Sequence, residues 1–279
     1  MKYTLVASDF DDSLCPKGQK VSEFTRKVIK KFTEKGGRFV IVTGRMNHSI
    51  YPIAKELGLS GEIVSCQGAV IRDIETNQVL KSKKIDRDLA VEYLKEAEKL
   101  GLIPQVYKDD CLYTVKENYH IEGYGEFCKV QYEVVDGTLS SEVENRLGDL
   151  DMIYLWTSEE KQSEYIKFLQ NKFSKRLDIT SSTPHNIEAV VYGASKGDAL
   201  LSLAKHYKIP IRKTMAFGDS LNDKSMIETA GLGVAMENAK DGLEKVADYV
   251  CEDTKNDGVA KTIEKFCLKR SMKWQRKRA

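Results

Sequence analysis

Both ends of the chain show short, nearly continuous apolar runs separated by segments whose apolar residues recur at helical spacing. The apolar runs predict strands over residues 3–8, 39–42, 63–65, 214–217, 232–235 and 248–251. The intervening segments predict helices between Ser22 and Gly36, over 50–57, 196–207 and 225–230, and between the last two strands. In the first helix, Ser22 is the expected N-cap, and Phe24, Val28 and Phe32 form one apolar stripe. Nearly continuous apolar strands that alternate with helices indicate a parallel sheet covered on both faces.

The middle of the chain, from about residue 83 to 187, has a different pattern, with strands of the exposed-face type. Helices are predicted over 87–100 and 159–173, and strands over 112–115, 130–135, 152–156 and around Ile179 and Ile187. We therefore predict an α/β fold. Residues 1–82 and 188–279 would form a discontinuous core with a Rossmann-like parallel sheet, and residues 83–187 an inserted α+β domain. Ligands of such open sheets bind beyond the carboxyl ends of the strands.

Two acidic loops follow predicted strands of the core. Asp9-Phe10-Asp11-Asp12-Ser13 ends the first strand, and Gly218-Asp219-Ser220-Leu221-Asn222-Asp223 follows the strand over 214–217. Two carboxylates two residues apart can divide phosphoryl transfer, one attacking phosphorus and the other moving protons. Alone, the first loop is better explained as a structural acidic turn, and the second also fits an Asp/Asn-rich helix cap. Together, at neighbouring strand ends, the loops predict a Mg²⁺ site.

Two further segments are expected at the same edge of the sheet. Thr43 follows the second strand and offers a hydroxyl, and Gly44 lets the backbone approach a phosphate closely. Lys196 begins a predicted helix and can bring an ammonium charge to the same place. Taken by itself, such a lysine is more often a solvated surface residue. Its position in the series with the two acidic loops is what favours a role in chemistry.

These four segments, in this order, resemble the haloacid dehalogenase (HAD) superfamily. Within it they resemble the Cof-type phosphatases, whose mixed α/β cap is inserted between the second and third motifs. The resemblance covers residues 1–266 and is strongest over 216–226 and 230–239. It implies a HAD-like core with an inserted cap. It also implies Mg²⁺-dependent hydrolysis of a small phosphate monoester, a sugar phosphate or similar metabolite, through an aspartyl-phosphate.

Position by position, the resemblance implies Asp9 as the nucleophile and Asp11 as the general acid and base. It places four residues on the phosphate side of the site: Thr43, Gly44, Lys196 and Asn222. It implies Mg²⁺ ligands from Asp9, the backbone carbonyl of Asp11, Asp219 and, less directly, Asp223. Asn222 and Asp223 would help to position Lys196 or a metal-bound water.

Three positions depart from the family pattern without removing a catalytic group. Asp12-Ser13 stands where Gly-Thr is usual, Gln67 where an asparagine is usual, and Glu237 where glycine is common. The longer Gln67 is expected to shift a substrate contact. Tyr113 is the second candidate contact, although packing in a half-buried sheet explains Tyr107, Tyr113 and Tyr132 at least as well. Trp156 is expected in the core of the cap.

The composition limits which binding partners and which cellular compartment are expected for this protein. Among 279 residues, 44 Lys and Arg balance 42 Asp and Glu, so no nucleic-acid partner is expected. No apolar run approaches membrane-spanning length, no secretion signal precedes Asp9, and the six cysteines include no Cys-x-x-Cys pair. We therefore expect reduced thiols, no membrane association and a cytoplasmic location. The basic tail over 269–278 is expected to be a solvated terminus. The oligomeric state stays open.

Two other functions are compatible with these residues. A phosphomutase of the same superfamily would return the phosphoryl group to a sugar, and net release of phosphate would distinguish the two. A slow-turnover phospho-acceptor or binding protein would keep the aspartate site. Asp11 and the full-size cap argue against it, because a base shortens the life of an acyl phosphate and a cap suits substrate enclosure.

Overall fold

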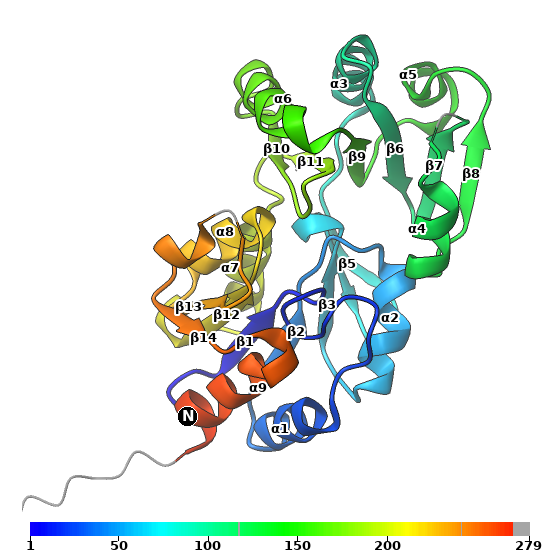
Figure 1. Cartoon of the computed structure of the whole chain (residues 1–279). Helices are drawn as coiled ribbons and strands as arrows, with labels where there is room; N and C mark the ends of the chain where they lie inside the picture. The colour runs from blue at the N-terminus through cyan, green and yellow to red at the C-terminus, as the bar shows by residue number, and fades with distance from the viewer. Residues whose placement is uncertain (117, 241, 270–279) are drawn as a thin grey trace, which may run out of the picture.

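A parallel sheet built from the two ends of the chain forms the lower half of the molecule (Figure 1). The structure, a computed structural model, describes residues 1–116, 118–240 and 242–269, so the predicted basic tail lies outside the described residues except for Lys269. In spatial order the strands are β14 (Tyr249–Cys251), β13 (Gly233–Met236), β12 (Thr214–Gly218), β1 (Leu5–Ser8) and β2 (Arg38–Ile41). All neighbouring pairs are parallel. This confirms the predicted parallel sheet.

Helices cover both faces of this sheet because its strands are apolar on both sides. Along β1, Val6 packs into one cluster with helices α1 and α9, while Leu5 and Ala7 pack into the other with α7 and α8. The helices are α1 (Glu23–Glu34), α2 (Asn47–Glu56), α7 (Lys196–His206), α8 (Lys224–Thr229) and α9 (Gly258–Ile263). Ser22 caps α1 as predicted, accepting a hydrogen bond from the Thr25 amide at 3.0 Å. Phe24 is 39% exposed and lies outside the buried stripe.

The segment predicted to begin a third strand of the parallel sheet belongs to a different sheet. Strands β3 (Glu62–Ser65), β4 (Val70–Asp73) and β5 (Val79–Ser82) form a three-stranded antiparallel sheet. A single parallel bridge between Val42 and Val64 links it to the end of β2. The cause is the short turn η1 (Cys66–Gly68), which reverses the chain at once, so that β4 pairs back along β3.

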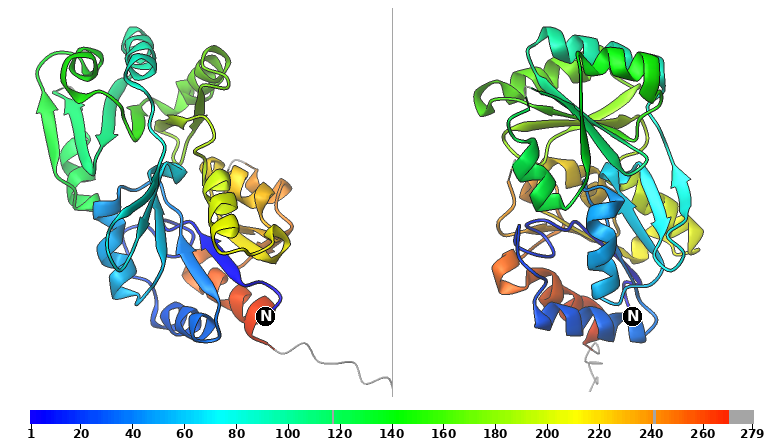
Figure 2. Two further views of the ribbon diagram at one scale, coloured as in Figure 1. Left: turned by 180° about the vertical axis from the view of Figure 1, so that it is seen from behind. Right: turned by 90° about the vertical axis from the view of Figure 1, so that its right-hand side faces the viewer.

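The middle of the chain forms a six-stranded sheet in the upper half of the molecule (Figures 1 and 2). In spatial order its strands are β10 (Leu177–Thr180), β11 (Asn186–Val191), β9 (Met152–Trp156), β6 (Ile103–Lys108), β7 (Cys111–Val115) and β8 (Tyr132–Val135). Its outer face carries α3 (Arg87–Lys99), α5 (Leu139–Glu142) and α6 (Glu159–Lys172), and α4 (Ile121–Cys128) lies near α2. We call this sheet and its helices the cap region, and the remainder the core region.

The two regions meet through an apolar cluster. Met46, Ala69 and Val70 of the core region pack with residues of the cap region that include Met152 and Val190. The predicted boundary after residue 187 falls inside β11, whose residues pair with β9 and β10 in the cap sheet. The chain therefore returns to the core region after β11 and not before it. The division into two domains stays a prediction.

Several cap elements differ from the sequence pattern. Strand β6 was not predicted because Pro104 interrupts its strand signal, and α4 was not predicted because Gly123 and Gly125 are poor helix formers. The helix expected between β13 and β14 is only the short 3₁₀ turn η5 (Leu243–Lys245) within the described part of that segment. The cap helices α3 and α6 match their predicted ranges to within one residue. Among the described residues, no helix is long and apolar enough to cross a membrane.

Candidate active site

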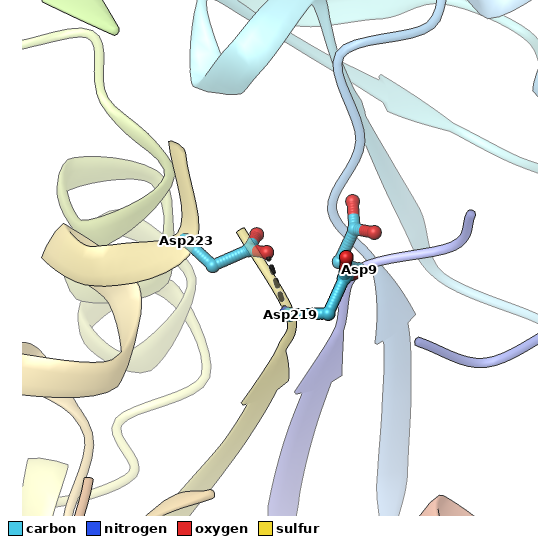
Figure 3. A group of neighbouring side chains, drawn as sticks. All are labelled: Asp9, Asp219 and Asp223. Carbon is cyan, nitrogen blue, oxygen red and sulfur yellow. Dashed lines mark hydrogen bonds between the residues drawn. The ribbon is translucent and has the colours of Figure 1, made fainter. Parts of the chain in front are cut away.

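The pairing of β1 with β12 brings the two acidic loops together. Ser8 is in register with Phe217, so Asp9 and Asp219 leave neighbouring strands at the same edge. Figure 3 shows the carboxylates of Asp9, Asp219 and Asp223 gathered there. All three residues are buried, and one oxygen of each lies within 4.8 Å of the others. The convergence that the strand ends predicted is therefore present in the fold.

Among the described residues, the buried cation that lies between these carboxylates is Lys196. It is the first residue of α7, which Ser195 and Asp198 cap reciprocally. Its Nζ is 2.6 Å from Asp9 Oδ1 and 2.6 Å from Asp223 Oδ1, and its side chain is fully buried. Although burial lowers the pKa of Lys196, the two carboxylates raise it above its ordinary value. The lysine is thus a fixed positive charge of the site, as predicted, and not a solvated surface residue.

One ammonium group does not balance three buried carboxylates. Burial, opposed by Lys196, raises the pKa of Asp9 well above its ordinary value, and burial with the neighbouring Asp223 raises that of Asp219 to about 6. Two negative charges are left without a partner if all three groups are ionised. A divalent cation with oxygen ligands would compensate them. The residues present therefore fit Mg²⁺.

The hydrogen bonds distinguish Asp223 from the other two carboxylates. Asp223 Oδ1 binds Lys196, and its Oδ2 accepts the backbone N–H groups of Asp219 (3.0 Å) and Ser220 (3.2 Å). It thereby holds the lysine and shapes its own loop. Asp219 accepts hydroxyl hydrogen bonds from Ser13 and Ser220, both at 2.8 Å, which orient its oxygens. The oxygens of Asp9 and Asp219 are therefore better placed than those of Asp223 to bind a metal ion.

Asp12 and Ser13, which depart from the family pattern, form specific contacts in the first acidic loop. Asp12 adopts a left-handed backbone conformation with φ 58°, which Asp tolerates better than most residues. Its carbonyl accepts hydrogen bonds from Asn238 Nδ2 (2.8 Å) and from the Thr254 hydroxyl. Ser13 retains the hydroxyl and directs it to Asp219. Asp12 and Ser13 therefore both form hydrogen bonds next to the predicted nucleophile.

Asp11 is held apart from the carboxylate cluster by Arg45, a residue to which the sequence pattern gave no role. The guanidinium makes a two-point salt bridge with the Asp11 carboxylate, with both N–O distances at 2.6 Å. Arg45 is 9% exposed and lies over the rings of Phe10 (5.1 Å) and Phe127 (4.6 Å). In the sequence, only its position directly after Thr43-Gly44 indicated that Arg45 could lie in the active site.

Thr43 and Gly44 lie where the sequence placed them. The Thr43 side chain is buried, and its Oγ1 accepts the Arg45 amide hydrogen at 3.2 Å. A Cβ atom at Gly44 would lie 2.4 Å from Gln67 Nε2, so a larger residue there would force the Gln67 amide to move. Both residues line a cavity at the mouth of the site.

This cavity has a volume of about 230 Å³ and is enclosed by both regions. The core region contributes the charged side chains of Asp9, Asp11, Arg45 and Asp219, together with Gln67 and Asn222. The cap region contributes Tyr124, Phe127, Tyr154, Glu188 and the loop 182–184. Burial raises the pKa of Glu188. The prediction that Gln67 lies at the mouth agrees with the structure. The position of Glu188 in the cavity wall was not predicted, because it depends on how β11 packs against the core region.

The other aromatic candidates lie elsewhere. Tyr113 packs on the helix-covered face of the cap sheet, with the Arg146 guanidinium 5.4 Å from its ring, and so the predicted substrate contact is not formed. Tyr107 is buried and its hydroxyl is hydrogen-bonded to that of Tyr124, while Tyr132 is 38% exposed. Trp156 is only partly buried, beside the cluster between the two regions, and not in the main cap core.

Comparison with known proteins identifies the family of this fold and site. The model of a family described as haloacid dehalogenase-like hydrolase matches residues 6–263. The chain belongs to this family. Phosphatase YwpJ of Bacillus subtilis is 30% identical to this hydrolase over 277 residues, covering 92% of this chain and 97% of YwpJ. The 5-amino-6-(5-phospho-D-ribitylamino)uracil phosphatase YcsE of the same organism is 29% identical, covering 95% and 96%.

The fold of this hydrolase also matches a solved structure closely. A haloacid dehalogenase-like hydrolase from B. subtilis superposes with a TM-score of 0.83 at 27% identity, covering 95% of this chain and 100% of that one. The predicted superfamily and fold class are thus confirmed. The prediction of a phosphoric monoester hydrolase is confirmed as well by the family and these relatives.

Proposed function

We propose that this enzyme is a Mg²⁺-dependent phosphatase that hydrolyses a small phosphate monoester through an aspartyl-phosphate on Asp9. The observation that carries the proposal is the buried group of three carboxylates around one lysine, at the ends of β1 and β12. A phosphate dianion would be repelled from three carboxylates, so the site needs a divalent cation as well as Lys196. Asp9, Asp219 and the main-chain carbonyl of Asp11 would hold it. When bound, Mg²⁺ neutralises carboxylate charge and polarises the phosphoryl group.

In the first step, Asp9 attacks phosphorus and the bond to the leaving oxygen breaks. Lys196, already within 2.6 Å of Asp9, stabilises the negative charge of the phosphoryl oxygens, and Thr43 offers its hydroxyl to one of them. Asp11, protonated and released from Arg45, gives a proton to the leaving oxygen. In the second step, Asp11 takes a proton from water, which attacks the aspartyl-phosphate and releases phosphate. Arg45 holds the Asp11 carboxylate at the cavity wall in a fixed orientation.

The cavity supports a leaving group about the size of one ring. Its volume of about 230 Å³ accommodates a phosphate and a small metabolite. The rings of Tyr124, Phe127 and Tyr154 favour stacking, and Glu188 disfavours a second anionic group near it. We infer a monophosphate of a sugar or a similar cytoplasmic metabolite. The name of YcsE, a phosphatase of a ribitylaminouracil phosphate, supports a substrate of this kind.

The test is phosphate release from a panel of metabolite monophosphates, measured with Mg²⁺ and after treatment with EDTA. We expect release of inorganic phosphate that EDTA abolishes and Mg²⁺ restores. Asp219→Asn should mimic loss of the metal, while Asp136→Asn, a matched control whose side chain is 93% exposed, should retain activity. Full turnover in chelated enzyme would refute the metal assignment. Isomerised sugar phosphate without net phosphate release would identify a mutase instead.

A further inference from the structure

The turn between β6 and β7, at the end of this hairpin that faces the core region, consists of two aspartates (Figure 1). Asp109 and Asp110 both have left-handed backbones, with φ 50° and 67°. Two-residue turns of this kind favour Asn-Gly or Asp-Gly, because glycine adopts a positive φ without strain. Asp110 therefore stands where the turn itself favours glycine. A side chain kept at such a position indicates a contact outside the hairpin.

The carboxylate of Asp110 caps a helix of the core region. Helix α2 begins at Asn47, so its N-cap position is held by Met46, whose side chain carries no oxygen that could accept an amide hydrogen bond. Asp110 Oδ1 instead accepts the backbone N–H of His48 at 3.0 Å, and its Oδ2 accepts Asn47 Nδ2 at 3.3 Å. His48 is the second residue of the helix, whose amide an N-cap side chain normally binds. The cap region thus supplies the acceptor that Met46 does not.

The residues around this contact hold the turn in place. Asp109 Oδ1 accepts a hydrogen bond from Lys84 Nζ at 2.6 Å, on the segment that leads into the cap region. Arg72 of β4 lies 4.0 Å from Asp110 Oδ2 and adds a positive charge on the core side. The side chain of Asp110 is 24% exposed, so its removal leaves no buried cavity. Its loss would therefore act through the hydrogen bonds to α2 and not through core packing.

The first turn of α2 is joined to the active site by Arg45. This residue lies two positions before the helix, and its guanidinium binds the Asp11 carboxylate with two N–O distances of 2.6 Å. The same guanidinium donates from Nη1 to the hydroxyl of Ser49, in the first turn of α2, at 3.3 Å. A displacement of that turn would therefore move the guanidinium relative to Asp11. Asp110 acts on the turn from the side opposite to the active site.

We propose that Asp110 is a positioning residue of the cap region, which fixes the first turn of α2 and, through Arg45, the carboxylate of Asp11. The inference rests on the proposed phosphatase function, in which Asp11 takes a proton from water in the second step. A base must lie within hydrogen-bonding reach of the proton it removes, so an ionised Asp11 held in one orientation suits that step. The contact of the cap hairpin with the core region is thereby coupled to the group that activates water.

Two substitutions at Asp110 separate the helix cap from the turn. Asp110→Gly removes the carboxylate but favours the left-handed backbone, so the hairpin is preserved. Its kcat on p-nitrophenyl phosphate should fall about five- to tenfold. Its kcat/KM, which covers only the steps up to release of nitrophenolate, should change by less than about twofold, because that first step needs little acid. Asp110→Asn tolerates the same backbone and still offers an oxygen to the His48 amide, so its kcat should stay within about threefold of the wild-type value.

A double-mutant cycle with Asp11 tests whether the effect passes through this residue. In Asp11→Asn no carboxylate is left for Arg45 to hold, so adding Asp110→Gly should lower kcat by less than about twofold. An effect of equal size in both backgrounds would overturn the proposal, because Asp110 would then act independently of Asp11. An unchanged kcat in Asp110→Gly, an equal loss in kcat/KM, or an Asp110→Asn variant that is equally impaired would overturn it as well. Thermal unfolding shows whether the variants fold, and failure of Asp110→Gly to fold would show that the contact is structural.

Asp109→Gly is the matched control, since it removes the neighbouring carboxylate of the same turn, which faces Lys84 and not α2. It should retain the kcat and KM of the wild type. The proposed function fails on different grounds, namely if Asp9→Asn remains active. If Asp9→Asn is inactive and Asp110→Gly behaves like Asp109→Gly, only the inference about Asp110 is wrong.

Discussion

The two sides of the cavity differ in how their residues are held and in what they can contribute. On the core side, Asp9 and Asp219 extend directly from buried parallel strands, and Lys196 begins a capped helix. On the cap side, Tyr124 and Phe127 come from α4 and Glu188 from β11, over an apolar cluster shared with the core. The core side concentrates charge on rigid elements, which suits phosphoryl transfer. The cap side offers rings and one carboxylate, which suits selection of the leaving group.

The largest expected effect comes from removing the nucleophile on the core side. Asp9→Asn keeps the shape of the side chain but is a far poorer nucleophile, and it also loses the charge that faces Lys196. Activity on every substrate should fall by about a thousandfold or more. Steady-state phosphate release measures this, with Asp136→Asn as the control. Substantial remaining turnover would show that a residue other than Asp9 forms the covalent intermediate.

A second, smaller effect separates the two tasks of Asp11. With an alkyl phosphate, Asp11→Asn should slow the first step by about a hundredfold, because no acid protonates the leaving oxygen. With p-nitrophenyl phosphate that step needs little acid, but hydrolysis of the aspartyl-phosphate still needs a base. Rapid-mixing experiments should show a burst of nitrophenolate stoichiometric with enzyme, and hydroxylamine should release the phosphate trapped on Asp9. The absence of both a burst and a greater loss on alkyl esters would contradict the role of Asp11.

The core side could be predicted from the sequence because its geometry follows from local pattern. An acidic loop at the end of an apolar strand stays at the strand end, and parallel pairing brings Asp9 beside Asp219. Arg45 and Glu188 could not be assigned in this way. The contact of Arg45 with Asp11 depends on the turn after β2, and that of Glu188 with Gln67 depends on the packing of the cap on the core. Spacing along the chain determines neither.

The cap region also shows why some helices and strands could not be predicted from sequence patterns. Helix α4 contains two glycines, and its position beside the active site is supported by tertiary contacts such as that of Phe127 with Arg45. Tyr113 alternates in β7 with residues facing the core region, so a shift of one position decides whether a ring faces the cavity or the helices. The alternating apolar pattern correctly predicted that β7 is a half-buried strand. Which of its side chains face the core region depends on the register of β7 with β6, which the sequence pattern does not give.

The charge imbalance on the core side predicts a pH-dependent stability without metal. Carboxyl groups such as Asp219, whose pKa is raised to about 6 mainly by burial, lose their protons at lower pH in the unfolded chain than in the folded one. The contribution of Asp219 to the stability of the metal-free protein should therefore fall as the pH rises from about 4 through 6, by on the order of 1–3 kcal/mol. Thermal unfolding in EDTA measures this.

Mg²⁺ provides the control for that measurement. A bound divalent cation favours the ionised carboxylates, so it should raise the unfolding temperature more at pH 7.5 than at pH 5. Asp219→Asn should weaken both the pH dependence and the response to Mg²⁺. Equal stabilisation by Mg²⁺ at both pH values would show that the carboxylate cluster is not the site at which the metal acts.

The smallest expected effect comes from a substitution on the cap side of the cavity. It tests directly whether the cap region selects the leaving group. Tyr154 lines the cavity, whereas Tyr113 packs on the opposite, helix-covered face of the same sheet. Tyr154→Phe removes one hydroxyl from the cavity, which should change kcat/KM for a metabolite ester by about two- to tenfold. Activity on p-nitrophenyl phosphate should change less, because the carboxylates and Lys196 that act on its phosphate are untouched. Tyr113→Phe, the matched control, should leave the ratio between the two substrates unaltered. If Tyr154→Phe lowers kcat/KM equally for both substrates, the cap side of the cavity excludes water or supports stability and does not select the leaving group.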